Sequence, residues 1–320
     1  MLTELADRPP VQRSLFATRS TGPQTVSRWQ DSMVSSTTAT THILPTATSG
    51  LPPTDEVASF APRVHVELAG PEGAPPLLVL HGWGSSASVM RGAFAALSDA
   101  WRIHNVDLPG HGRTPPPPSA WGVPEYAELV ANYVRSEGIA PLPVLAHSNG
   151  GRIALHLASD PTTADLFTRL ALVSPSGVRP HRKAGYYLRR AWAGLLKAPF
   201  RVLPDGPLRR RGLDWVRSTI YWRLIASSDY LQASGVMRET FVKTVNYHLD
   251  DRLRRVRVPL LVMWGDRDAD VSRYEVETMV EAVADARLEV LPGAGHYGFL
   301  DAPAAYASAV RSFLPAPAHG

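Results

Sequence analysis

The sequence predicts an α/β fold in which helices cover both faces of a mostly parallel, doubly wound sheet. From about residue 60 onward, short apolar runs alternate with longer helix-like stretches, and this alternation is typical of such sheets. Several runs are continuously apolar, as expected of strands that are buried on both faces. The predicted strands cover residues 63–69, 76–80, 102–107, 142–146, 170–174, 259–264 and 287–291.

The clearest helix-like stretches between these strands are residues 124–137 and 152–158. The alternation then stops for about eighty residues, which contain helical candidates and no strand-like run. We therefore predict a helical cap, residues 177–257, inserted between two late strands. The core that it covers would consist of residues 59–176 and 258–320.

Residues 1–58 differ in composition from the rest of the chain. They are rich in Ser, Thr and Pro and show no helical or strand periodicity. Such a segment buries too little apolar surface to offset the entropy lost on ordering, so we predict a disordered tail. Met33 is an alternative translation start, which leaves open whether residues 1–32 are translated.

The composition excludes several classes of protein. Of the 320 residues, 44% are hydrophobic and 19% are charged, which is typical of a globular protein with a sizeable core. The absence of cysteine excludes disulfides and thiolate metal sites. No apolar run approaches the roughly 20 residues of a membrane-spanning helix, and no secretion signal is recognisable. We therefore expect a cytoplasmic protein.

The net charge of +4 is too small to indicate a nucleic-acid-binding protein. The positive charge is concentrated in residues 179–223 of the predicted cap, where twelve Lys and Arg accompany two acids, Asp205 and Asp214. The simplest interpretation of this segment is a solvent-exposed face of the cap. It also leaves open a weak attraction to an anionic substrate or an anionic surface. No nucleic-acid partner is expected, and the oligomeric state is left open.

Polar and glycine-rich motifs follow the predicted strands, at the edge where open α/β sheets bind their ligands. After strand 142–146 comes His147-Ser148-Asn149-Gly150-Gly151, followed by a helix. This arrangement resembles a nucleophile elbow, G-x-S-x-G. The tight turn that exposes the serine needs small residues two places away on either side. Gly150 meets this requirement, and Ala146 adds one methyl group in place of the first glycine.

Two more glycine-rich loops follow earlier strands. Strand 76–80 is followed by His81-Gly82-Trp83-Gly84, which resembles the HG-x-G loop of the α/β-hydrolase family. The motif Asp107-Leu108-Pro109-Gly110-His111-Gly112-Arg113-Thr114 closely matches the D-x-P-G-H-G-x-S signature of the same family, with Thr in the last position.

The last two strands are followed by an acidic loop and a histidine loop. Residues 265–272 contain Asp266, Asp268 and Asp270. Their similarity to the family pattern W-G-x-x-D-x-x-V-P selects Asp268 as the acid. The sequence Pro292-Gly293-Ala294-Gly295-His296 resembles the family's G-H ending, with His296 in the position of the base.

Together these motifs, which extend over about residues 60–315, resemble the α/β-hydrolase superfamily and, within it, the capped, cofactor-free serine hydrolases. The resemblance implies that Ser148 is the nucleophile, that His296 is the base and that Asp268 orients the base. It also implies an oxyanion hole formed by the backbone N–H groups of Trp83 and Asn149. The serine at the elbow argues against epoxide hydrolases and haloalkane dehalogenases, which use Asp there.

This set of residues predicts hydrolysis of a carboxylic ester or related acyl bond through an acyl-enzyme. We expect a small acyl substrate, no cofactor and no metal, with Trp83, Tyr297 and Trp192 as candidate substrate-binding residues. A C–C bond hydrolase or an acyltransferase would use the same triad, and the substrate and its chain length stay open. A non-catalytic binding protein on this scaffold is disfavoured, because the triad and both oxyanion loops are complete.

Three further histidines, His81, His111 and His147, are expected to be structural. His81 would form hydrogen bonds within the oxyanion loop, and His147 would contribute packing.

Overall fold

The computed structural model describes residues 40–42, 55–181 and 233–316, together with residues 199, 204, 206–208 and 211. All of them belong to one compact unit, residues 37–320. Most of the predicted cap, including Trp192, lies outside the described residues. The same holds for the predicted tail, apart from residues 40–42 and 55–58.

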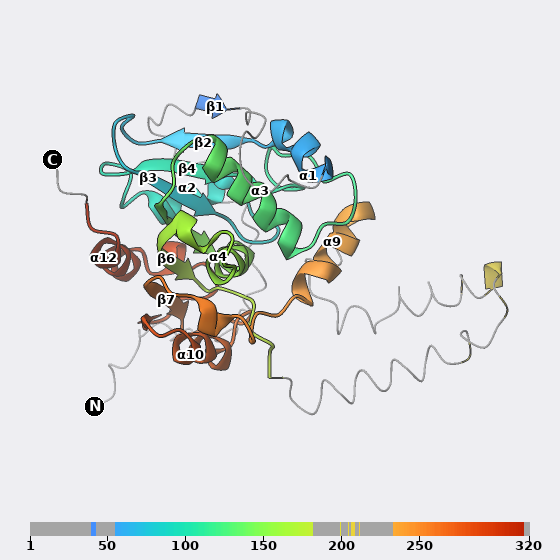
Figure 1. Cartoon of the computed structure of the whole chain (residues 1–320). Coiled ribbons are helices and arrows are strands. Elements are labelled where there is room, and N and C mark those ends of the chain that lie inside the picture. Colours follow the sequence, from blue (N-terminus) through green and yellow to red (C-terminus); the bar gives the residue numbers. More distant parts are fainter. Residues whose placement is uncertain are drawn as a thin grey trace, which may run out of the picture. The chain divides into compact units, whose positions relative to one another are not determined.

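In the part of the chain that the structure describes, eight strands form one sheet in the order β1-β2-β4-β3-β5-β6-β7-β8 (Figure 1). The strands are Thr40–His42 (β1), Val66–Ala69 (β2), Pro76–Leu80 (β3), Arg102–Val106 (β4), Leu142–His147 (β5), Phe167–Val173 (β6), Leu260–Gly265 (β7) and Ala286–Leu291 (β8). Strand β2 pairs antiparallel with β1 and β4. All other neighbouring pairs are parallel, so the predicted mostly parallel sheet is confirmed.

The seven predicted strands are all present, with ends shifted by at most three residues. The central strands β5 and β7 are buried at every position, which explains why they read as continuous apolar runs. Strand β1 was not predicted. It contains only three residues, Thr-Thr-His, which are too few to show a strand periodicity. Its backbone pairs with β2 from Thr40–Leu68 to His42–Val66.

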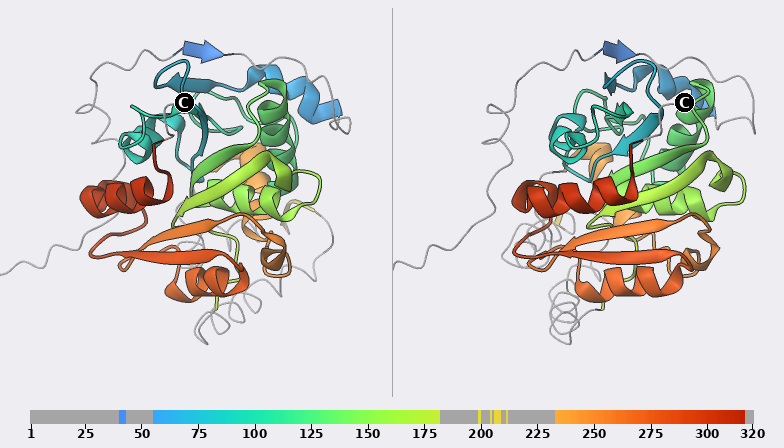
Figure 2. Two further views of the ribbon diagram at one scale, coloured as in Figure 1. Left: turned by 60° about the vertical axis from the view of Figure 1, so that its left-hand side comes forward. Right: turned by 90° about the vertical axis from the view of Figure 1, so that its left-hand side faces the viewer.

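Helices cover both faces of the sheet, and the left view of Figure 2 shows the green α3 and the red α12 on opposite sides of the strands. One buried apolar cluster includes residues of α1 (Asp55–Phe60), α3 (Val123–Ser136), α4 (Asn149–Ser159) and α10 (Arg273–Ala282). A second cluster includes residues of α2 (Ala87–Phe94), α11 (Gly298–Asp301) and α12 (Pro303–Phe313). Strand β5 alternates between the two clusters, with Val144 and Ala146 in the first and Leu145 in the second.

Short 3-10 helices occupy Ala61–Arg63 (η2), Ala164–Leu166 (η3) and Leu253–Arg255 (η4), and α9 extends over Gly235–Val245. The helix predicted at 124–137 is α3, which has Pro124 in its first turn and begins where the Gly122 N–H donates to the Glu125 carboxylate at 2.7 Å. Among the described residues, no helix is long and apolar enough to cross a lipid bilayer.

The core begins earlier than the predicted boundary at residue 59. Helix α1 starts at Asp55 and buries Val57 and Phe60. The ring of Phe60 lies 5.1 Å from that of Trp121, whose indole N–H donates to Glu56 at 2.7 Å. Residues 55–58 therefore pack with the core. A six-residue helix is too short to show amphipathic periodicity, and tertiary contacts select it.

The predicted end of the cap also differs from the structure. Helix α9 lies between β6 and β7, within the range 177–257 of the predicted cap. The residues that follow it, however, return to the core, because Leu249, Leu253 and Val256 are buried in the same cluster as α3 and α4. The Leu249 N–H donates to the Gly177 carbonyl at 2.8 Å. The core therefore resumes near Leu249, before residue 258.

Replacing Phe60 by Ala should lower the free energy of unfolding by about 3–5 kcal/mol, because it empties a buried ring position. Chemical denaturation measures this change. The matched control is Ser59→Ala at an exposed position of the same helix, and it should change stability by less than about 0.5 kcal/mol. A Phe60→Ala effect no larger than that of the control would show that α1 belongs to a detachable tail.

Candidate active site

The motif loops meet at one edge of the sheet. They follow β3, β4, β5, β7 and β8, and these strands are parallel in the sheet, so their carboxyl ends lie at the same edge. The structure therefore brings together residues that are as far apart in sequence as Gly82 and His296.

Ser148 lies in a strained turn between β5 and α4. Its φ of 49° and ψ of −112° are costly for a residue that has a Cβ atom. Three hydrogen bonds hold this backbone. The Ser148 N–H donates to the Val173 carbonyl at 3.0 Å, and the Ser148 carbonyl accepts from the N–H groups of Arg152 at 3.2 Å and Ser176 at 3.1 Å. Such a turn presents the serine side chain at the end of the strand.

Close backbone contacts explain the small residues around Ser148. A Cβ atom at Gly150 would lie 2.5 Å from the carbonyl oxygen of Leu80, so only glycine fits there. Ala146 is fully buried, and its methyl group is accommodated. A Cβ atom at Gly82 would lie 3.0 Å from the Cβ of Ser148. The loop that carries Trp83 therefore lies directly against the turn.

His81 holds this loop in place. The side chain is fully buried, its Nδ1–H donates to the Gly82 carbonyl at 2.7 Å, and its Nε2 accepts from the Leu108 N–H at 2.9 Å. Burial lowers the pKa of His81 to about 4, and nearby His111 acts in the same direction. The ring is therefore neutral at neutral pH, and it supports the loop without adding charge. This is the structural role predicted for His81.

The two predicted oxyanion donors are backbone N–H groups next to Ser148. Trp83 follows Gly82 in the loop that touches Ser148. Asn149 is the first residue of α4, and the N–H groups of a helix's first turn have no acceptor within the helix. Both predicted donors are thus backbone groups of segments that adjoin Ser148.

Asp107 anchors the loop that contains His111. Its buried carboxylate accepts from the Ala87 N–H at 2.6 Å, from His65 Nδ1 at 3.0 Å and from the Arg113 N–H at 3.0 Å. A Cβ atom at Gly112 would lie 2.1 Å from this carboxylate. The motif after β4 therefore has a structural role, because its backbone folds around the buried carboxylate of Asp107.

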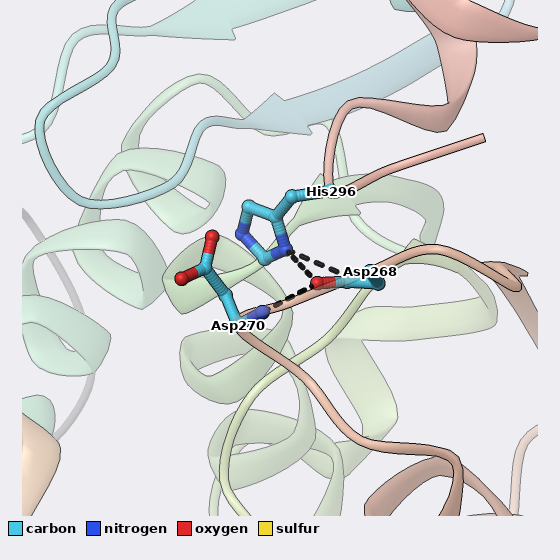
Figure 3. A group of neighbouring side chains, drawn as sticks. All are labelled: Asp268, Asp270 and His296. Carbon is cyan, nitrogen blue, oxygen red and sulfur yellow. Dashed lines mark hydrogen bonds and ion pairs between the residues drawn. The ribbon is translucent and has the colours of Figure 1, made fainter. Parts of the chain in front are cut away.

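His296 and Asp268 form a hydrogen-bonded pair after β8 and β7 (Figure 3). The Nδ1 atom of His296 lies 3.1 Å from Oδ1 and 3.0 Å from Oδ2 of Asp268. The Asp268 side chain is fully buried and that of His296 is 15% exposed. Asp268 Oδ1 also accepts the N–H groups of Asp270 at 2.8 Å and Val271 at 3.0 Å.

Opposing effects act on the pKa of Asp268. Burial raises it, but the hydrogen bond to His296, the charge of that ring and the Val271 N–H outweigh burial, so the pKa is lowered. The hydroxyl of Ser174, which follows β6, acts in the same direction. The carboxylate is therefore ionised at neutral pH, as required to stabilise a neighbouring imidazolium.

The three aspartates of the acidic loop have different surroundings. Asp266 accepts the Gly293 N–H at 2.7 Å and ties the two loops together. Asp270 is exposed, and its carboxylate points toward the His296 ring (Figure 3). One ligand atom from each of Asp268, Asp270 and His296 lies within 4.8 Å of the others. Within this group, His296 Nδ1 is already in hydrogen-bonding distance of both Asp268 carboxylate oxygens.

Gly265, the last residue of β7, sets the distance between the acidic and histidine loops. A Cβ atom there would lie 2.3 Å from the Ala294 carbonyl oxygen and 2.4 Å from that of Gly295. The backbones of the two loops are therefore in contact. This contact places Asp268 within hydrogen-bonding distance of His296.

Trp83 lines a cavity of about 230 Å³ beside the loop that follows β3. The other lining residues are Gly84, Gly110, His111, Ala233, Ser234 and Met237. Edge-to-face contacts hold the Trp83 ring, 4.8 Å from the ring of His111 and 5.1 Å from that of Phe241. Burial lowers the pKa of His111, so the described walls carry no charge at neutral pH. They suit an uncharged group.

The other candidate substrate-binding residues are placed differently. The Tyr297 ring packs on His147 at 4.7 Å and on Phe299 at 5.9 Å, so it contacts the end of β5 and helix α11. Trp192 lies outside the described residues. Met237, which α9 brings to the cavity, and Ser174 belong to no motif, so the sequence pattern gave no sign of either.

Comparison with known proteins establishes the family. The family model described as alpha/beta hydrolase fold matches residues 75–303, which is more than half of the chain, and the chain therefore belongs to this family.

An uncharacterized protein of Mycobacterium tuberculosis is 25% identical over 259 residues, which cover 75% of each chain. A pimeloyl-[acyl-carrier protein] methyl ester esterase of Aeromonas hydrophila is 28% identical over 258 residues, 75% of this chain and 95% of that protein. The structure of a Bacillus subtilis carboxylesterase has a TM-score of 0.59 at 19% identity, covers 88% of this chain and 93% of its own, and shows the shared fold.

Replacing Gly265 by Ala should push the acidic loop away from the histidine loop, because the added Cβ collides with two carbonyl oxygens. We expect the free energy of unfolding to fall by about 1–3 kcal/mol and the rate of ester hydrolysis to fall at least about tenfold. Denaturation and initial rates on p-nitrophenyl acetate measure these effects.

The matched control is Gly73→Ala, because a Cβ atom at Gly73 has open space around it. Near-native stability and activity in both variants would contradict the proposed contact between the two loops.

Proposed function

We propose that this protein is a serine hydrolase that cleaves a carboxylic ester or a related acyl bond. The observation that carries the proposal is the hydrogen-bonded pair of His296 and Asp268, which lies at the same sheet edge as the strained turn of Ser148. The relative that is named as a methyl ester esterase supports the same class of reaction.

In the first step, Ser148 Oγ attacks the acyl carbon and His296 takes the hydroxyl proton on Nε2, because a neutral serine is a weak nucleophile. Asp268 lies within hydrogen-bonding distance of Nδ1 of His296, and accepting the Nδ1–H would leave Nε2 to take the serine proton. The ionised carboxylate then stabilises the imidazolium that forms. The lowered pKa of Asp268 supports this role.

The tetrahedral oxyanion would accept the backbone N–H groups of Trp83 and Asn149. Such donors are effective because they need no rearrangement when charge develops. His296 next gives its proton to the leaving alcohol, which leaves an acyl-enzyme on Ser148. Water enters, His296 acts again as base, and the released acid restores the free serine.

The uncharged cavity beside Trp83 supports a neutral acyl or alcohol group at this position. The basic segment 179–223 of the predicted cap lies mostly outside the described residues. Its attraction to an anionic part of the substrate, or to an anionic surface, stays a prediction that salt dependence can test.

Replacing Ser148 by Ala should reduce kcat on an activated ester by about 10³-fold or more without unfolding the protein. The same variant should lose labelling by a fluorophosphonate probe, because the probe reacts with the activated hydroxyl. Ser98→Ala on the surface serves as the control. If the Ser148 variant keeps more than about a tenth of the activity, with contaminating esterases excluded, Ser148 is not the nucleophile.

Replacing Asp268 by Asn should reduce kcat by about 10⁴-fold, because an amide can stabilise the wrong tautomer of His296. Asp266→Asn keeps an oxygen that can accept the Gly293 N–H, and Asp270→Asn changes an exposed group. Both controls should stay within about tenfold of the wild type. Initial rates for the three variants decide the assignment. Inactivity of Asp266→Asn or Asp270→Asn beside an active Asp268→Asn would place the acid elsewhere in the loop.

A further inference from the structure

The side chain that precedes Ser148 touches both of the loops that surround it. His147 ends β5 and is 1% exposed. Its Nε2 lies 3.0 Å from the backbone carbonyl oxygen of His296. A carbonyl oxygen only accepts hydrogen bonds, so Nε2 carries the proton and donates it. The ring of His147 therefore holds the main chain of the predicted base.

The Nδ1–Cε1 edge of the same ring lies against the oxyanion loop. A Cβ atom at Gly82 would lie 2.8 Å from Nδ1 and 3.3 Å from Cε1 of His147. Within the described residues, Nδ1 has no hydrogen-bond partner. The ring therefore lies between two loops and separates them. It forms one hydrogen bond to the histidine loop and is in van der Waals contact with the oxyanion loop.

Aromatic contacts fix the plane of this ring. Tyr297 packs on it at 4.7 Å with 31° between the ring planes, and the ring of Phe299 lies 5.6 Å away, edge to face. The ring of His296 itself meets His147 edge to face at 4.8 Å. With its plane fixed from several sides, the Nε2–H of His147 can point only toward the His296 carbonyl.

His147 carries no charge at neutral pH. Burial lowers its pKa to about 3, and the neighbouring His296 ring acts in the same direction. A second cation next to His296 would oppose imidazolium formation there. A neutral ring that donates one hydrogen bond to the backbone supports the base without this cost.

We propose that His147 is a positioning residue that sets the placement of His296 relative to Ser148 through its hydrogen bond to the His296 carbonyl. This role rests on the proposed serine-hydrolase function. The base is then held at two points, since Asp268 binds its Nδ1 and His147 binds its main chain. Loss of the second point lets the ring move, and a misplacement of about 1 Å can reduce a rate on the order of 100-fold.

The test separates the hydrogen bond from simple packing. His147→Phe keeps an aromatic ring and removes the donor, whereas His147→Gln keeps an N–H donor at a similar reach. Each variant is compared with the wild type by its Tm, its rate of fluorophosphonate labelling at Ser148, and its kcat and KM on p-nitrophenyl acetate. His147→Met is a second donor-free variant, should the Phe variant fail to fold.

We expect the donor-free variant to lose about 10- to 100-fold in labelling rate and in kcat, with KM changed by less than about threefold. The Gln variant should recover most of this loss. A donor-free variant as active as the wild type overturns the proposal, and so do equal losses in the donor-free and Gln variants at equal Tm, since packing alone would then explain them. A wild-type protein that neither binds the probe nor hydrolyses esters overturns instead the serine-hydrolase function itself.

Discussion

Contact between backbones at the carboxyl edge of the sheet is the constraint on which the candidate site depends. An added Cβ atom at Gly150 would lie 2.5 Å from the carbonyl oxygen of Leu80 at the end of β3, and one at Gly265 would lie 2.3 Å from that of Ala294 in the histidine loop. The loops that carry Ser148, Trp83, Asp268 and His296 therefore approach more closely than loops with side chains at these positions would allow. This proximity makes a 3.0 Å hydrogen bond possible between residues from two different strands.

The distribution of charge follows from the same close packing. Asp268 is the ionised group, and it is stabilised by His296 and by backbone N–H groups. His81 and His147 are buried and neutral, with pKa values lowered to about 4 and about 3. Each donates one hydrogen bond to a backbone carbonyl of a loop at the site. The loops after β3 and β8 are thus held by neutral rings, without the cost of a buried charge.

The prediction from sequence was most accurate where local pattern and tertiary environment agree. Strands β5 and β7 are continuous apolar runs buried on both faces, so their positions could be read directly. The choice of Asp268 over its neighbours came from a family motif, and its carboxylate lies 3.1 Å from Nδ1 of His296. Strand β1 and helix α1 were missed, because three and six residues are too few for periodicity and because distant partners stabilise them. The cytoplasmic location, the role of the basic segment and the choice of acyl bond stay predictions.

The sequence by itself determined the order of the strands along the chain, the family and the residue types at the ends of the strands. Those properties are local, since they depend on apolar runs, glycine spacing and short motifs. Only the tertiary structure decided which functional groups touch. His147 was expected to contribute packing, and its hydrogen bond to the carbonyl of His296 joins residues 149 positions apart. The cavity wall formed by Met237 likewise exists only because α9 lies against the loop after β4. Such contacts depend on how distant segments pack, and no pattern within either segment encodes them.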